Sequence, residues 1–260
     1  MNITHFQRSV RVNIKNIVKS PNFSLAVLLC FCVLFAEIIK PMQTIFSTPF
    51  NKYGDAYFFN MSLHFGYFIY AAPLVCAFAS GGLFYDDQET GFNKLRLMKS
   101  GRKAYQYSLW VGATLGGGFA VMSGILLFSV VCATVFGPQD PASILVAVDG
   151  WLPVLSHSMG NWAYMIAHAL LGFLFGMVWS GIGLVFSVFV PNRYISYLSP
   201  FIICFSSVLV LPNNLRPLEM LVQMNWDAFT FPKLIGYQFI LYIVALICYA
   251  VVFDRRVIHG

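Results

Sequence analysis

The sequence predicts an all-α integral membrane protein with six transmembrane helices. Hydrophobic residues make up 58% of the chain and charged residues only 10%, whereas soluble domains have about 45–50% and about 25%. The apolar residues fall into six long runs, and a bilayer core of about 30 Å needs roughly 20 residues per helix. We therefore expect a single transmembrane domain over residues 1–260, with no soluble catalytic domain.

The N-terminal segment, residues 1–20, mixes basic and apolar side chains at roughly helical spacing. This pattern predicts an amphipathic helix that lies on the membrane surface with its basic residues toward lipid phosphates; binding to an anionic partner in solution is the alternative. No small-x-small cleavage site follows the first apolar run, so we expect that run to remain as a span. The basic residues are Arg8, Arg11, Lys15 and Lys19, and the apolar ones are Phe6, Val10, Ile14, Ile17 and Val18.

Proline, glycine and polar residues separate the expected spans. Pro21 and Asn22 precede the first span, and the tight turn 191–193 separates the fourth from the fifth. The third and fourth runs exceed the minimum length, so we expect them to tilt or to project beyond the bilayer. The six spans cover approximately residues 23–39, 62–84, 105–136, 161–190, 194–211 and 234–253.

The distribution of lysine and arginine predicts the orientation. Twelve of the sixteen lie in the N-terminal segment, the 85–104 connection, the 191–193 turn and the C-terminal tail, and four lie in the alternate connections. Because basic residues concentrate in cytoplasmic loops, we expect a multi-pass protein of the plasma membrane with both termini in the cytoplasm. Topology also explains the net charge of +6 without a nucleic-acid partner. Apolar stretches in the outer connections 137–160 and 212–233 predict elements that dip into the interface, and whether they gate a pathway stays open.

Two spans carry small residues every four positions. Such stripes let another helix approach closely. They predict either ordinary packing within one bundle, the simpler interpretation, or an interface with a second subunit. The stripes are Gly112, Gly116, Ala120 and Gly124 in the third span, and Gly172, Gly176 and Ser180 in the fourth.

Polar groups within the spans are few. His64 and His168 are explained by a neutral imidazole that bonds to a neighbouring helix, although an intramembrane histidine can also mark a pathway. Glu37 lies near a span end and is expected to be interfacial. The six cysteines all fall inside apolar runs and indicate no disulfide framework. With no catalytic or metal-site motif, we expect no catalytic residues and no metal site.

The connection after the second span is acidic first and basic afterward. Asp86, Asp87 and Glu89 come near the start of a predicted short helix over residues 86–101, and Lys94, Arg96 and Lys99 come toward its end, which complements the helix dipole. Phe92 and Leu95, with Met98 as a further candidate, would share one exposed face. A short cytoplasmic helix with an apolar face suits insertion into a partner's groove.

In this connection the chain resembles the membrane subunits of the ABC-2 exporter family. Their Glu-x-Gly element is matched by Glu89, Thr90 and Gly91, and their small-polar-basic segment by Ser100, Gly101 and Arg102. The basic N-terminal helix, the six spans and the length also agree. The small antimicrobial-peptide, drug and immunity exporters look closest in length and loop style.

The resemblance implies a permease without enzymatic activity that pairs with a second copy or a related permease. Two separate ABC ATPase subunits would bind ATP and Mg²⁺, so this chain would need no cofactor of its own. The ATPase-coupling residues would be Asp86, Asp87, Glu89, Gly91, Phe92, Leu95 and Arg96. The cargo would be a peptide, drug-like or other amphipathic molecule. A secondary transporter, an anchoring or assembly subunit and an intramembrane enzyme remain the alternatives.

Overall fold

The computed structural model describes residues 3–45, 54–137, 159–190, 192–212, 215–222 and 231–259. In this part of the chain all regular secondary structure is helical. Six helices are long and apolar enough to cross a membrane. The predicted all-α membrane fold is therefore confirmed at the level of helix type and number of candidate spans.

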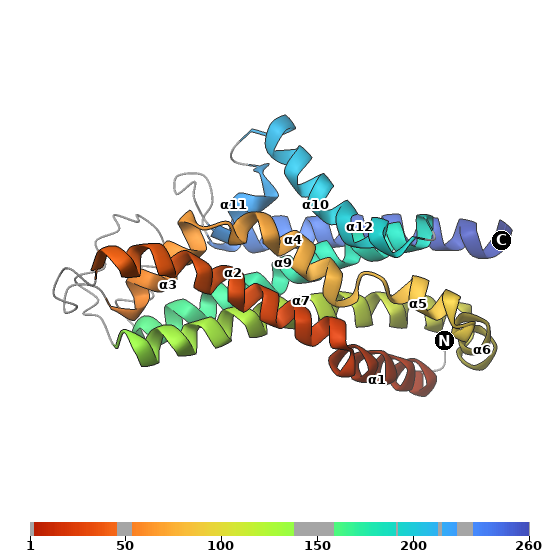
Figure 1. Ribbon diagram of the computed structural model, residues 1–260. Coiled ribbons are helices and arrows are strands. Elements are labelled where there is room, and N and C mark those ends of the chain that lie inside the picture. The colour runs from red at the N-terminus through yellow and green to blue at the C-terminus, as the bar shows by residue number, and fades with distance from the viewer. Residues whose placement is uncertain are drawn as a thin grey trace.

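The candidate spans form most of the helical structure, and shorter helices lie between them (Figure 1). The helices are α1 (Ile3–Lys19), α2 (Pro21–Ile45), α3 (Asp55–Phe65), α4 (Phe68–Ser80), α5 (Leu83–Glu89), α6 (Phe92–Ser100), α7 (Arg102–Val135), α9 (Asn161–Phe189), α10 (Arg193–Val210), α11 (Pro217–Val222) and α12 (Phe231–His259).

Five of the six expected spans agree closely with the helices. The stretches that could cross a membrane are Pro21–Ile39, Arg102–Val135, Asn161–Phe189, Arg193–Val210 and Lys233–Arg256. The long α7 and α9 have the extra length that the sequence predicts. Most of the outer connection 137–160, and much of the 212–233 connection, lies outside the described residues.

The expected second span, residues 62–84, differs from the structure, which has α3, α4 and α5 in its place. The first break falls at Gly66 and Tyr67, where the backbone N–H of Tyr67 donates to Glu37 Oε1 on α2 at 3.2 Å. A Cβ on Gly66 would lie 2.5 Å from the Ser62 carbonyl oxygen and 2.6 Å from Glu37 Cγ. The close approach of α2 therefore requires glycine at this break, and the candidate span begins only at Phe68.

Helices α4, α7 and α9 form the centre of the bundle, and α2, α10 and α12 surround it. The outer helices expose many large apolar side chains, such as Leu28 on α2, Leu209 on α10 and Phe239 on α12. Figure 1 also shows α10 leaning away from the other long helices. Apolar surface of this kind on long helices is expected where lipid, not water, surrounds the protein.

Small residues bring the central helices together. A Cβ on Gly117 of α7 would lie 2.3 Å from Ser180 Cβ, and one on Gly176 of α9 would lie 2.6 Å from the Gly117 carbonyl oxygen. The predicted α9 stripe thus packs against α7, with Gly172 meeting Val121 and Ile125.

The predicted α7 stripe packs on α1, α2 and α4 of the same chain, and the α4 contact is between Gly116 and Ser80. Gly112 and Gly116 lie against Asn13 and Ile17 of α1, and Gly124 lies against Cys30 of α2. Ala120, between them, is fully buried. The α7 face that meets α9 contains Gly117 and Gly118, which the four-residue spacing left out.

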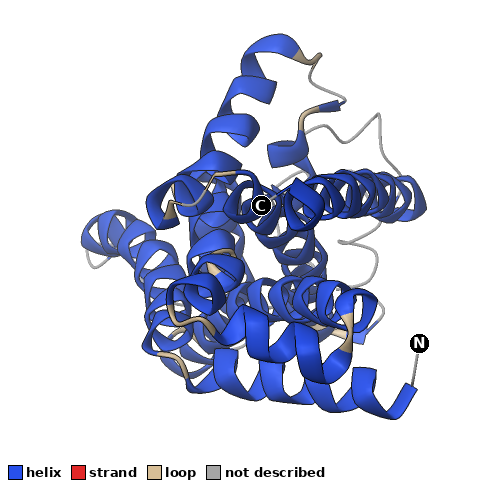
Figure 2. Ribbon diagram, turned by 90° about the vertical axis from the view of Figure 1, so that its right-hand side faces the viewer, coloured by secondary structure: helices blue, strands red, loops and turns tan. Residues whose placement is uncertain are grey.

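Both chain termini lie at one end of the bundle, together with α5 and α6 (Figure 1). We call this the N/C end, and Figure 2 shows the molecule with this end toward the viewer. Helix α1 packs there against the first part of α7, since Asn13 contacts Ser108 and Ile17 lies beside Gly116. This end therefore brings together three basic segments of the sequence, which are the N-terminal segment, the 85–104 connection and the C-terminal tail.

Candidate functional site

The candidate site is the α5–α6 hairpin, residues 83–100, at the N/C end. The sequence predicted one helix over residues 86–101, but Thr90 and Gly91 divide this stretch into two helices. Gly91 has φ 72° and ψ 4°, and Gly101 has φ 78° and ψ 156°. Because residues with a Cβ rarely adopt positive φ, these two glycines fix where α6 begins and ends.

The inner side of the hairpin contains a mostly buried ion pair whose two members are hydrogen-bonded to α1 and α7. Arg96 Nη1 lies 3.0 Å from Asp87 Oδ2 and donates to Asn13 Oδ1 at 2.5 Å. Tyr105 Oη donates to the same Asp87 oxygen at 3.1 Å, and Asn13 Nδ2 donates to the Ser108 carbonyl at 3.0 Å. The network therefore joins α5 and α6 to each other and to two further helices.

The residues on either side of Asp87 connect α5 to two other helices. Asp86 Oδ1 lies 3.7 Å from Arg193 Nε on α10. Gln88 Oε1 accepts a hydrogen bond from Arg256 Nη2 on α12 at 3.3 Å. Arg256 also donates to the Val188 carbonyl of α9 and stacks 5.6 Å from the Phe84 ring centroid. Three successive residues of α5 thus contact three different parts of the bundle.

The outer side of the hairpin is exposed and partly apolar. Glu89 and Gly91 are exposed. Phe92, Leu95 and Met98 on α6 expose 53%, 51% and 76% of their surfaces. These three apolar side chains are therefore accessible at the N/C end. An apolar surface at one end of a short helix can bind a partner groove.

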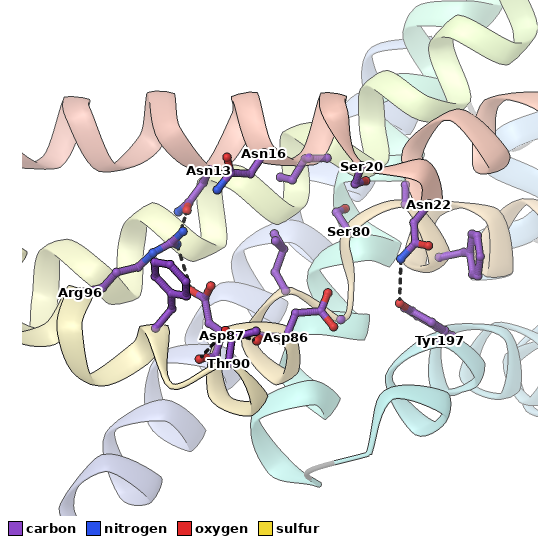
Figure 3. Close-up of a pocket in the computed structure, with 16 residues that line it drawn as sticks. Asn13, Asn16, Ser20, Asn22, Ser80, Asp86, Asp87, Thr90, Arg96 and Tyr197 are labelled. Atoms are coloured by element: carbon purple, nitrogen blue, oxygen red, sulfur yellow. Dashed lines mark hydrogen bonds and ion pairs between the residues drawn. The ribbon is translucent and has the colours of Figure 1, made fainter.

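A polar pocket of about 270 Å³ lies between α1, α5 and α10 (Figure 3). Arg96 and Asn13 bridge it at one side, and Asn22 Nδ2 and Tyr197 Oη bridge it at the other at 3.4 Å. Amide, hydroxyl and carboxylate groups line it, so it can hold water or a small polar ligand. The labelled lining residues are Asn13, Asn16, Ser20, Asn22, Ser80, Asp86, Asp87, Thr90, Arg96 and Tyr197.

Of the predicted coupling residues, the structure separates two groups. Asp87 and Arg96 point into the buried network and Asp86 faces α10, whereas Glu89, Gly91, Phe92 and Leu95 are on the surface. Sequence reasoning missed Asn13, Tyr105 and Arg256. The signal for Asn13 was an amide within the N-terminal helix, between the apolar positions 10, 14 and 17.

The intramembrane histidine His168 lies in a buried aromatic and polar cluster. His168 Nδ1 lies 3.1 Å from the Tyr164 carbonyl oxygen, and the ring packs 5.7 Å from that of Phe59. The side chain of His64 is outside the described residues. Among the residues that the structure describes, no group of three or more His, Cys, Asp or Glu is arranged to hold a metal ion.

Comparisons of the chain with protein-family models, with curated proteins and with solved structures found no match. The functional conclusion therefore depends on the residues and geometry of the hairpin and on the membrane fold.

Proposed function

We propose that this chain is the membrane-spanning permease subunit of an ATP-driven exporter. The observation that carries the proposal is the α5–α6 hairpin, which has an exposed apolar face on α6 and a base tied to α1, α7, α10 and α12. A separate ATPase subunit would bind the α6 face and would supply ATP and Mg²⁺.

The contacts of α5 suggest how force would pass into the membrane. A push on α6 would act through Arg96 and Asp87 on α1 and α7, and through Asp86 and Gln88 on α10 and α12. Helices that move as packed units can switch a bundle between inward-open and outward-open states. The proposed cargo is a peptide, drug-like or other amphipathic molecule, and the proposed assembly is a dimer with a second copy or a related permease.

The orientation belongs to the same proposal. The N/C end would face the cytoplasm of the cell, where the ATPase is found, because it gathers the basic segments of the chain. The basic side chains of α1 would then contact the phosphates of the inner leaflet.

The experiment is capture of co-expressed ABC ATPase subunits from the source organism by the full-length chain in mild detergent. Leu95→Glu combined with Met98→Glu places charge on the exposed α6 face and should reduce ATPase recovery at least tenfold. Lys103→Glu, an exposed change at the same end, is the matched control. Docking through α6 would be refuted if the unaltered chain, the double variant and the control recovered the same amount of ATPase. It would also be refuted if none of them recovered any.

A secondary transporter is the second candidate, and the Glu37 contact favours it. Broken helices with polar groups at the break are typical of such transporters, and Glu37 accepts from Tyr67 at the α3–α4 break. The test is cargo movement in proteoliposomes that contain no ATPase and have an ion gradient. Movement that depends on the gradient and is lost in Glu37→Gln would support this candidate against the exporter.

A further inference from the structure

A second recess at the N/C end, the α1–α6 groove, adjoins the polar pocket and shares Asn16, Phe92 and Arg96 with it. It has a volume of about 510 Å³ and opens between α1 and α6. Its walls combine cationic and apolar side chains, and its floor belongs to the first turns of α7. The wall residues used below are Arg8, Val12, Phe92, Leu95 and Lys99, and the floor residues are Tyr105 and Ser108.

Two cations of the groove have uncompensated charge. Arg8 on α1 and Lys99 on α6 are exposed, and neither forms an ion pair or hydrogen bond with another described residue. The third cation, Arg96, is paired with Asp87. Opposite walls therefore each present one free positive charge, which favours an anionic group between them.

The apolar part of the groove requires more than an inorganic anion. Val12, Phe92 and Leu95 expose 42%, 53% and 51% of their surfaces, and a phosphate ion would leave them in contact with water. A ligand that carries hydrocarbon next to its anionic group would cover them, and apolar burial contributes about 25 cal/mol per Å². Ser9 and Asn16 add hydrogen-bonding groups to the same walls.

The position of the floor indicates the source of such a ligand. Tyr105 and Ser108 belong to α7, whose candidate span is Arg102–Val135. The groove therefore adjoins the end of a membrane span, where phospholipid headgroups lie. An acidic amphipathic peptide has similar chemistry, but a site at this level is reached directly from the lipid leaflet.

We propose that the α1–α6 groove binds one anionic phospholipid. The phosphate would lie between Arg8 and Lys99, and the start of an acyl chain would follow Val12, Phe92 and Leu95. This is a discrete site shared by two helices, which differs from the general attraction of a basic helix for an anionic surface. The site shares Phe92 and Leu95 with the α6 face proposed to dock the ATPase, but lipid binding itself requires only that the protein be in a membrane.

The test is native mass spectrometry of the delipidated full-length protein, titrated with phosphatidylglycerol and, separately, with phosphatidylcholine. We expect one phosphatidylglycerol to bind in preference to phosphatidylcholine. Arg8→Gln with Lys99→Gln should weaken that binding roughly 30-fold, because each cation near an anionic lipid contributes about fivefold to the affinity and the two factors multiply. Arg255→Gln with Lys103→Gln removes the same residue types from exposed positions outside the groove and should leave the affinity unchanged.

A second variant tests the apolar wall without altering charge. Val12→Ser with Leu95→Ser should weaken phosphatidylglycerol binding, because the acyl chain loses contacts. These side chains are half-exposed, so the variants are expected to fold, and the thermal midpoint of each protein checks this.

Three outcomes would overturn the proposal. Equal losses in the groove variant and in the Arg255 and Lys103 control would indicate general surface attraction. Displacement of the lipid by inorganic phosphate at millimolar concentration would indicate an anion site. Equal binding of the two lipids, with competition by an acidic amphipathic peptide, would indicate a peptide groove. Since no ATPase is present, none of these outcomes bears on the proposed exporter function.

Discussion

Gly91 and Gly101 both have positive φ, but their conformations differ in a way that substitutions can measure. Gly91 is in the left-handed helical region, which alanine reaches at a cost of about 1–2 kcal/mol and asparagine more easily. Gly101, at φ 78° and ψ 156°, is in a region almost restricted to glycine. A Cβ at either position would meet no atom within 4 Å, so the cost is conformational.

We therefore expect Gly91→Ala to lower the unfolding free energy by about 1 kcal/mol and Gly91→Asn to lower it less. At Gly101, alanine and asparagine should both be costly, at about 1–3 kcal/mol. Thermal unfolding of the purified variants in detergent measures the difference. Rescue by asparagine at both positions, or at neither, would contradict the assigned conformations.

Asp87 and Asp86 are adjacent in sequence but should differ strongly in their contribution to stability. The Asp87 side chain is 12% exposed and accepts from both Arg96 and Tyr105, whereas that of Asp86 is 42% exposed and lies 3.7 Å from Arg193. Asp87→Ala leaves a mostly buried arginine without its carboxylate and should cost about 2–3 kcal/mol. Asp86→Ala should cost less than about 1 kcal/mol.

Chemical unfolding of the two variants in the same detergent provides the comparison. The double variant Asp87→Leu/Arg96→Met should regain much of the loss, because it removes both charges together. A similar cost for Asp86→Ala and Asp87→Ala would argue against the buried network.

The sequence could separate exposed from buried residues of the hairpin only in part. Phe92 and Leu95 were expected on an exposed face because short-range helical spacing determines which side chains lie together. Asp87 and Arg96 were grouped with them, since their inward direction depends on Asn13, which is 83 positions from Arg96 in the chain. Long-range hydrogen bonds of this kind leave no periodic pattern in the sequence.

At the scale of elements, the approach of α7 to α9 predicts a steric test. Gly117→Ala places a Cβ 2.3 Å from Ser180 Cβ and 2.9 Å from the Gly176 carbonyl oxygen, so the two helices must separate. Overpacking of this kind costs about 1–3 kcal/mol. Gly236→Ala on α12 is the matched control, because its Cβ would meet nothing within 4 Å and alanine favours helix.

Thermal midpoints in detergent should fall for Gly117→Ala and stay level or rise slightly for Gly236→Ala. Equal midpoints for both variants would show that α7 and α9 do not pack as closely as described.

Element lengths followed well from hydropathy, but breaks and facing directions did not. Five spans agree within a few residues because bilayer thickness limits helix length. The break at Gly66 escaped detection because an apolar run gives no information on where the backbone leaves the helix. The four-residue spacing of small residues in α7 also does not indicate which neighbouring helix each glycine contacts.

For the whole molecule, the gathering of both termini and the α5–α6 hairpin at one end makes the proposed orientation testable. The N/C end carries the N-terminal segment, the 85–104 connection and the tail, which hold most of the lysine and arginine residues. Since such residues resist translocation, a green fluorescent protein fused after Gly260 should fluoresce in the cytoplasm, and alkaline phosphatase fused there should be inactive. Alkaline phosphatase fused after Gly137, at the other end of α7, should be active.

The charge argument itself can then be checked in the same assay. Replacing Arg8, Arg11, Lys15 and Lys19 with glutamine removes four of the twelve basic residues on the N/C side but leaves the connection and tail intact. If the overall excess of lysine and arginine on the N/C side sets the topology, most molecules should keep their orientation and a measurable minority should be inverted. An active phosphatase after Gly260 in the unaltered chain would place the N/C end outside, and an ATPase could then no longer reach the hairpin.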